Sequence, residues 1–152
     1  MTAEPVTIVL LGEPVPFART RRGFGGALFT PATQRIAAAA LRYEAQAVMQ
    51  LRKLTILDEP LRIDLSAEVK IPASWSKKKQ WRAMTGGLRP AKKPDLDNLY
   101  KLAADALCGI VFRDDCLIVD MRCRKVYSGQ PKLVVTVQPI DPAASFALRA
   151  AE

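Results

Sequence analysis

The run LRIDLSAEVKI, residues 61–71, constrains the fold of this chain more than any other segment. Apolar side chains occupy every second position from Leu61 to Ile71 without exception, and the positions between them are polar or charged. A period of two places the apolar set on one face of a β-strand. The sequence therefore predicts a half-buried strand in a sheet that has one covered face.

Other segments supply the remaining elements. Apolar runs predict strands over Thr7–Leu11, Leu117–Tyr127 and Lys132–Ile140. A long amphipathic helix is predicted from Pro31 to about Leu54, and a second helix from Asp97 to a stop at Gly109. The apolar positions that define the first helix are Ile36, Ala40, Tyr43, Ala47, Leu51 and Leu54. Ser74–Lys79 reads as the start of a further helix, in which Trp75 and Trp81 are expected to be packing anchors and not base-stacking platforms.

These elements predict an α/β (α+β) fold. A chain of 152 residues, with 49% hydrophobic and 25% charged side chains, fits one globular domain over residues 1–152. We expect a core over residues 6–140, in which a mixed sheet of about four strands carries two main helices. Residues 141–152 form a tail that either makes a short closing helix or frays.

Composition excludes several function classes. The chain has no histidine, which removes serine–histidine triads, imidazole bases and HExxH zinc helices. Its three cysteines are widely spaced and are expected to fill apolar positions, without disulfides or a metal knuckle. The N-terminus has no basic signal region and no segment reaches membrane-spanning length, so a cytoplasmic protein is expected.

Charge is strongly segregated along the chain, whose formal net charge is +8. The interval from Lys70 to Lys93 carries eight basic side chains and no acidic one, and the loop PVPFARTRRGFGGALFTP mixes arginine with phenylalanine and glycine. Either segment can contact phosphate, although a solvated face or a plain surface hairpin would read the same way. The candidate DNA-binding residues are Arg19, Arg21, Arg22, Lys77, Lys78, Lys79, Arg82, Lys92 and Lys93.

Acidic residues begin where the basic interval ends. Asp95 and Asp97 straddle the predicted helix entry, and an i, i+2 pair in extended backbone would point both carboxylates the same way. Lys101 lies one helical turn after Asp97. Oxygen ligands without Cys or His suit Mg2+ or Mn2+ and disfavour zinc. The competing interpretation is structural: a helix cap, an ion pair of Lys101 with Asp97 or Asp105, and a turn at Asp114-Asp115.

An ordered set of motifs resembles one nuclease family. The segment KPDLDNLYKLAADALCGIVFRDDCLIVDM, together with the upstream EPVPFARTRRGFGGALFTPATQR and IPASWSKKK, is similar to the signature of the RusA family of Holliday junction resolvases. That resemblance implies a homodimer of mixed α/β fold that cleaves branched DNA with a divalent metal. It also implies a bacterial or phage-encoded, nucleoid-associated protein.

The resemblance assigns roles to individual residues. It implies that Asp95, Asp97 and Asp115 are the metal-binding carboxylates and that Lys101 is their basic catalytic partner. Asp114, Asp120 and Asn98 are candidates for outer positions around the metal. The chain departs from the family pattern at Cys116-Leu117, where a polar residue and glutamine are frequent.

The resulting expectation is a Mg2+-dependent endodeoxyribonuclease that resolves four-way junctions by paired cuts. Two alternatives stay open at this point: a structure-specific module that binds junctions without cutting them, and a nuclease that acts on flaps or RNA.

Overall fold

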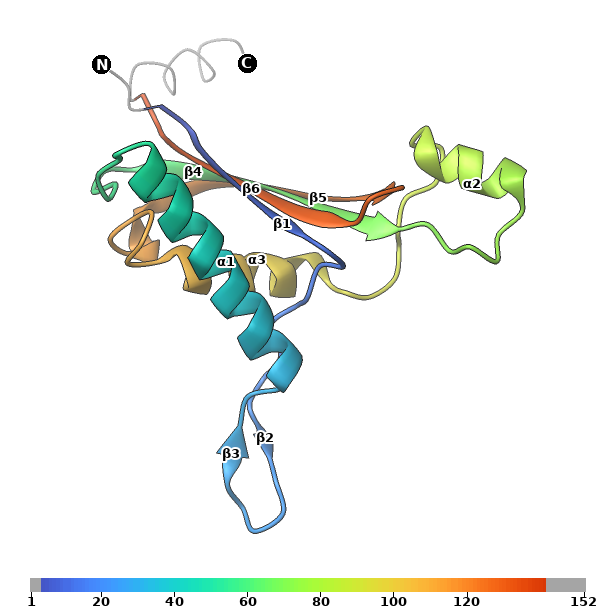
Figure 1. Ribbon diagram of the computed structural model, residues 1–152, viewed down its shortest axis with the longest axis horizontal. Coiled ribbons are helices and arrows are strands. Elements are labelled where there is room, and N and C mark those ends of the chain that lie inside the picture. The colour runs from blue at the N-terminus through green and yellow to red at the C-terminus, as the bar shows by residue number, and fades with distance from the viewer. Residues whose placement is uncertain (1–3, 142–152) are drawn as a thin grey trace.

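A mixed four-stranded sheet with helices on one face forms the body of the molecule in the computed structural model, which describes residues 4–141 (Figure 1). Its strands are β1 (Val6–Leu11), β4 (Leu61–Lys70), β5 (Ile118–Ser128) and β6 (Lys132–Pro139), in the order β1-β6-β4-β5. The β4–β5 pair is parallel, and the other two pairs are antiparallel. The prediction of a mixed α+β single domain with a four-stranded sheet is confirmed.

Helices α1 (Ala32–Leu51) and α3 (Leu96–Leu107) cover one face of this sheet. The alternation in β4 is realised as predicted, because Leu61, Ile63 and Leu65 are buried under the helices. Between them, Arg62 pairs with Asp64 at 3.0 Å on the opposite face of the sheet, which is open. The two helices therefore supply the apolar cover, and the other face is left to charged and polar side chains.

A third helix, α2 (Lys77–Met84), stands away from this core at the far end of β4 and β5 (Figure 1). A small separate cluster of Val69, Ala83 and Tyr127 attaches it. Trp75 packs edge-on against Tyr127 with ring centroids 5.3 Å apart, so its role as an anchor is confirmed. Trp81 is 66% exposed, so the same expectation was wrong for that residue. We call residues 71–93 the α2 arm.

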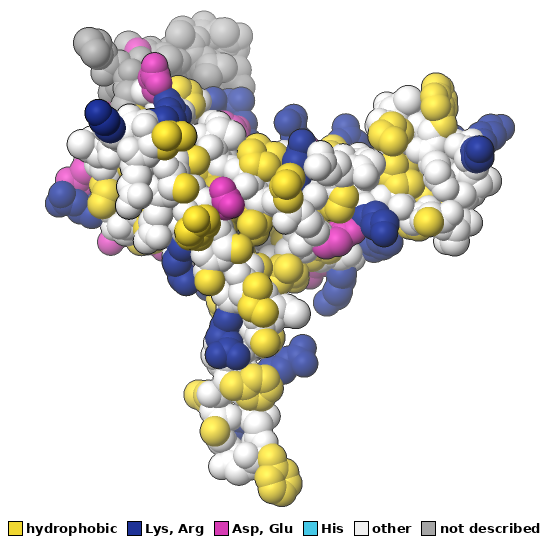
Figure 2. Space-filling model, viewed as in Figure 1, with side chains coloured by type: hydrophobic (Ala, Val, Ile, Leu, Met, Phe, Trp, Pro, Cys, Tyr) yellow, Lys and Arg dark blue, Asp and Glu magenta, His cyan; other side chains and the backbone are white. Residues whose placement is uncertain are grey.

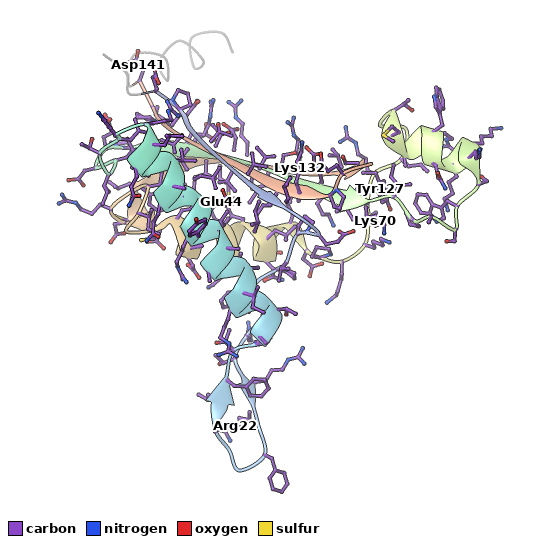
Figure 3. The ribbon with its side chains drawn as sticks, viewed as in Figure 1. Arg22, Glu44, Lys70, Tyr127, Lys132 and Asp141 are labelled. Carbon is purple, nitrogen blue, oxygen red and sulfur yellow. The ribbon has the colours of Figure 1, made fainter. Side chains whose placement is uncertain are left out.

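A short hairpin forms a second projection. Strands β2 (Arg21–Arg22) and β3 (Leu28–Phe29) pair below the start of α1, and the chain reverses through glycines with positive φ at Gly25 and Gly26. We call residues 19–29 the basic hairpin; Arg22 lies on it in Figure 3. The basic loop identified in the sequence is therefore a short hairpin.

Three details of the sequence prediction need correction. Helix α1 ends at Leu51, and the face that packs on the sheet carries Leu41, Ala45 and Met49 instead of the predicted stripe. Cys116 is exposed, because it lies in the 3-10 turn η1 (Asp115–Leu117) at the surface. Helix α3 begins at Leu96, so Asp97 lies inside its first turn and not in extended backbone. The predicted tail lies outside the described residues, apart from Asp141.

Candidate carboxylate groove and nucleic-acid interface

Asp95 and Asp97 line one groove of about 740 Å³. One wall of the groove is the segment 14–19, which leads into the basic hairpin and which we call the hairpin root. The other is the segment 93–98, which leads into the first turn of α3. The lining residues are Pro14, Pro16, Phe17, Ala18, Arg19, Lys93, Pro94, Asp95, Asp97 and Asn98, which we call the carboxylate groove. Two predicted carboxylates and two predicted DNA-binding cations, Arg19 and Lys93, therefore meet at one site although they come from segments about 75 residues apart in sequence.

The two carboxylates are free to bind a ligand. Asp95 occupies the N-cap position of α3 in extended backbone, yet its side chain accepts no capping hydrogen bond from the first turn, all of which the structure describes. Among residues 4–141, neither Asp95 nor Asp97 forms an ion pair. Both are exposed at the positive end of the helix dipole. The structural interpretation of Asp95 as a simple cap is not supported by this geometry.

Lys101 lies on the groove side of α3 without an acidic partner. Its Nζ is 4.8 Å from the centroid of the Phe17 ring, a cation–π contact with the root of the hairpin. Within the described part of the chain it makes no ion pair with Asp97 or Asp105. The ammonium group is therefore held one turn beyond Asp97, with its charge available to a phosphate.

Asp115 lies in the 3-10 turn η1 and is not among the residues that line the groove. Burial raises the pKa of Tyr100 above its ordinary value, and the charges of Cys123 and Asp115 raise it further. Tyr100 follows Asp97 by three residues, so Asp115 acts electrostatically on the same part of the helix. Still, no three Asp, Glu or Cys side chains within residues 4–141 gather closely enough to hold one ion. The fold brings Asp95 and Asp97 into one groove, and Asp115 acts on Tyr100 by its charge without lining that groove.

The outer candidates occupy different places. Asp114 caps η1, since its Oδ1 accepts a 2.9 Å hydrogen bond from the Cys116 amide, which lowers the pKa of the Asp114 carboxyl. Asp120 lies on the open face of the sheet, 3.9 Å from both Arg62 and Arg122. Asn98 lines the groove, and its backbone carbonyl accepts a 2.9 Å hydrogen bond from the Phe17 amide. Of the three, Asn98 alone lines the carboxylate groove.

The basic residues form two groups around this groove. The hairpin carries Arg19, Arg21 and Arg22, and Figure 2 shows a hydrophobic side chain at its tip, where Phe24 is fully exposed. The α2 arm carries exposed Lys77, Lys78 and Arg82, while Lys79 lies 3.9 Å over the ring of Trp75. Both projections end at the groove, the hairpin through Arg19 and the arm through Lys93.

Sequence reasoning missed two side chains that fix the walls of the groove. Gln34, buried on α1, accepts a 2.7 Å hydrogen bond from the Ala18 amide at the hairpin root. Lys125, half-buried on β5, donates hydrogen bonds to the carbonyls of Lys92 at 2.6 Å and Pro94 at 2.9 Å. Both act on backbone atoms of a distant segment, which leaves no signal in local sequence.

We expect Lys125 to act as a positioning residue for Asp95. Lys125→Met keeps the aliphatic stem but removes the donor for the two carbonyls, so the loop that leads into α3 loses its tether. The affinity of the carboxylate groove for a divalent cation should fall about 10- to 100-fold. Calorimetric titration of the full chain with Mn2+ measures this affinity.

Lys132→Met is the matched control, because Lys132 is a partly buried lysine on strand β6, where it pairs with Glu68 of β4 at 3.8 Å. It should leave this affinity unchanged. Equal effects of the two substitutions, or a Lys125→Met variant with wild-type affinity for the cation, would contradict the positioning role.

A second hollow, of about 320 Å³, lies on the open face of the sheet between Asp64, Ser66, Arg122 and Arg124. Its carboxylate is already paired with Arg62. The carboxylate groove is therefore the better candidate for metal and phosphate chemistry. No helix within the described residues is long and apolar enough to cross a membrane.

Comparison with known proteins agrees with this choice. Residues 12–138 match the family model described as endodeoxyribonuclease RusA. The chain is also 31% identical over 138 residues to the uncharacterized protein YqaN of Bacillus subtilis (strain 168), an alignment that covers 90% of this chain and 97% of that protein. The matched range contains the whole groove and both projections.

Proposed function

The chain belongs to the RusA family of endodeoxyribonucleases, and from this premise we propose that it is a Mg2+-dependent nuclease that resolves four-way DNA junctions. The observation that carries the proposal is the pair of exposed carboxylates, Asp95 and Asp97, which form no ion pair within residues 4–141 and lie between two cationic projections. Basic side chains on both sides of the groove can bind phosphates of DNA arms that run in different directions. The carboxylates are the oxygen ligands that a hard cation such as Mg2+ prefers.

Asp95 and Asp97 are proposed to hold the metal, and Asp115, although it does not line the groove, is proposed as the third carboxylate. Mg2+ is commonly bound in proteins by one or two carboxylates together with waters and substrate phosphate oxygens. Two exposed carboxylates in an open groove match this coordination preference, and Mn2+ would bind to the same oxygen ligands. Asp95 and Asp97 would hold the ion in the groove, where its charge would make a bound water more acidic and would offset negative charge on the scissile phosphate.

The remaining roles fall to residues of the chain itself. Arg19 and Lys93 would hold phosphates on opposite walls of the groove, and Lys101 would neutralise the phosphoryl oxygens with its point charge. Asp114 and Asp120 are proposed to act on the site only from a distance, through η1 and the β5 strand. The outer basic residues of the hairpin and the α2 arm would follow the DNA backbone, giving salt-sensitive binding that senses shape more than sequence.

Junction resolution requires two cuts related by a two-fold axis, so we propose that the active form is a homodimer. Each protomer would then supply one groove to each of two equivalent strands.

The test is cleavage of a synthetic four-way junction by the full chain, with and without Mg2+, at fixed salt. We expect paired cuts in Mg2+, none in EDTA, and much weaker cleavage of linear duplex. Binding without cleavage in Mg2+ or Mn2+ would instead identify a junction-binding module. Faster cleavage of a flap or hairpin RNA than of the junction would assign a different substrate.

A further inference from the structure

Helix α1 presents an apolar stripe to solvent in addition to the face that packs on the sheet. Ile36, Tyr43 and Leu51 are 69%, 70% and 86% exposed, and Ala40 and Ala47 lie between them at helical spacing. We call these five residues the α1 stripe. Figure 2 shows hydrophobic side chains along this helix on the face turned to the viewer. A continuous exposed stripe of this length marks an interaction surface in a soluble chain.

The order of large and small side chains in the stripe is the same in both directions along the helix. Ile36 and Leu51 are equally distant in sequence from a point between Tyr43 and Glu44, and so are Ala40 and Ala47. The order is large, small, large, small, large. An antiparallel copy of the helix would therefore set each large aliphatic side chain against the other, and alanine against alanine, which allows the helices to approach closely.

From this symmetry we infer that the α1 stripe binds the α1 stripe of a second copy of this chain in antiparallel orientation. The inference deepens the proposed function, from which it takes only the requirement for a dimer. The contact would run about 23 Å along each helix from Ile36 to Leu51.

A hollow beside Ile36 fits the same partner. It measures about 300 Å³ and is lined mostly by apolar side chains, including Leu10 and Leu11 of β1, Val15, and Ile36 and Ala40 of α1. In the antiparallel register the partner's Leu51 lies opposite Ile36, at the mouth of this hollow. Leu51 is the most exposed of the three large side chains of the stripe, so it is available to enter the hollow of the other copy.

The polar groups near the centre are also compatible with two-fold pairing. The register places Tyr43 opposite the partner's Glu44, so the tyrosine hydroxyl can donate to that carboxylate, and symmetry repeats the bond. Glu44 is visible on the solvent side of α1 in Figure 3. The stripe itself contains no charged side chain, as is usual at the centre of a protein interface.

The first test is Tyr43→Glu, with the mass of the full chain measured by sedimentation equilibrium in the absence of DNA. Charge buried without a partner at the centre of the interface should raise the dimer dissociation constant by at least about 100-fold. Arg42→Glu is the matched control, because it introduces the same residue at the exposed position that precedes Tyr43 on the helix and lies outside the stripe. It should remain dimeric. Circular dichroism should show that both variants stay folded.

The second test measures the register. In a Cys116→Ser background, which removes the exposed natural thiol, Ala40→Cys and Ala47→Cys variants are mixed and oxidised. Disulfide-linked dimers should form in the mixture and not in either variant alone, because only the Ala40–Ala47 pair is brought to bonding distance. A parallel pairing would instead link each variant to itself, and that result would overturn the inference.

Two further results would overturn the inference: a wild-type chain that is monomeric at 100-fold the protein concentration of the junction cleavage assay, or a Tyr43→Glu variant that is as dimeric as wild type. Neither measurement contains DNA or metal. A dimer with the expected register that fails to cut any junction would therefore refute the proposed nuclease while supporting the interface.

Discussion

Asp97→Asn should abolish most cleavage of a four-way junction while leaving binding intact. The carboxamide is isosteric with the carboxylate but carries no charge, so it holds a divalent cation in the carboxylate groove much more weakly. We expect the rate in Mg2+ to fall by about 100- to 1000-fold, the loss seen when one electrostatic catalytic group is removed. Junction affinity should stay equal or increase, since one negative charge near the phosphates is lost. Single-turnover cleavage and a gel-shift titration measure the two quantities.

Asp105→Asn provides the control for this substitution. Asp105 is exposed on the same helix, two turns further on, and does not line the groove. The change in charge and volume is identical, so the overall field of the protein is altered equally. Wild-type cleavage by Asp105→Asn is expected. Wild-type cleavage by Asp97→Asn would exclude this aspartate from the chemistry.

Phe112→Ala should be the most destabilising of the single substitutions considered. Phe112 is fully buried in the main core. Its backbone carbonyl accepts a 2.7 Å hydrogen bond from the Gly109 amide, in the turn that follows α3. Truncation would leave a cavity and lower the free energy of unfolding by about 3–5 kcal/mol. For a chain of this size the melting temperature should fall by about 10 °C.

Urea denaturation followed by circular dichroism measures this loss. Val119→Ala, a smaller truncation at a position 62% exposed on β5, should change the free energy of unfolding by less than about 0.5 kcal/mol. Because Asp115 follows Phe112 by three residues, Phe112→Ala should also slow cleavage at temperatures where the chain remains folded. A stable Phe112→Ala variant would mean that the core closes around the vacancy without cost.

The sheet was predictable because its pattern admits one solution. The strict alternation from Leu61 to Ile71 can bury only one set of side chains, and that set is the one found beneath the helices. Helix α1 was different, since it carries two apolar stripes. The stripe through Ile36 and Tyr43 looks at least as hydrophobic in sequence as the one through Leu41 and Met49 that meets the sheet. Local periodicity locates a helix but cannot rank two such faces.

The candidate groove was predictable to a similar extent. Asp95 and Asp97 stood out because both lie at a helix entry next to a basic interval, and the structure places both in one groove. The opposite wall, from Pro14 to Arg19, could not be foreseen from spacing alone. It is brought there by hydrogen bonds of the Phe17 and Ala18 amides to Asn98 and Gln34. Such contacts depend on how α1 and α3 cross the sheet, which no short segment encodes.

The divergence of the basic hairpin and the α2 arm has a consequence for what the protein selects (Figure 1). A double helix resists curvature over lengths of about 50 nm, so a straight duplex that lies along one projection leaves the other in water. A branched molecule already changes direction where its arms meet, without elastic cost. Two cationic projections that point in different directions from one acidic groove would therefore favour branched DNA over straight duplex, because only the branched molecule can contact both without bending.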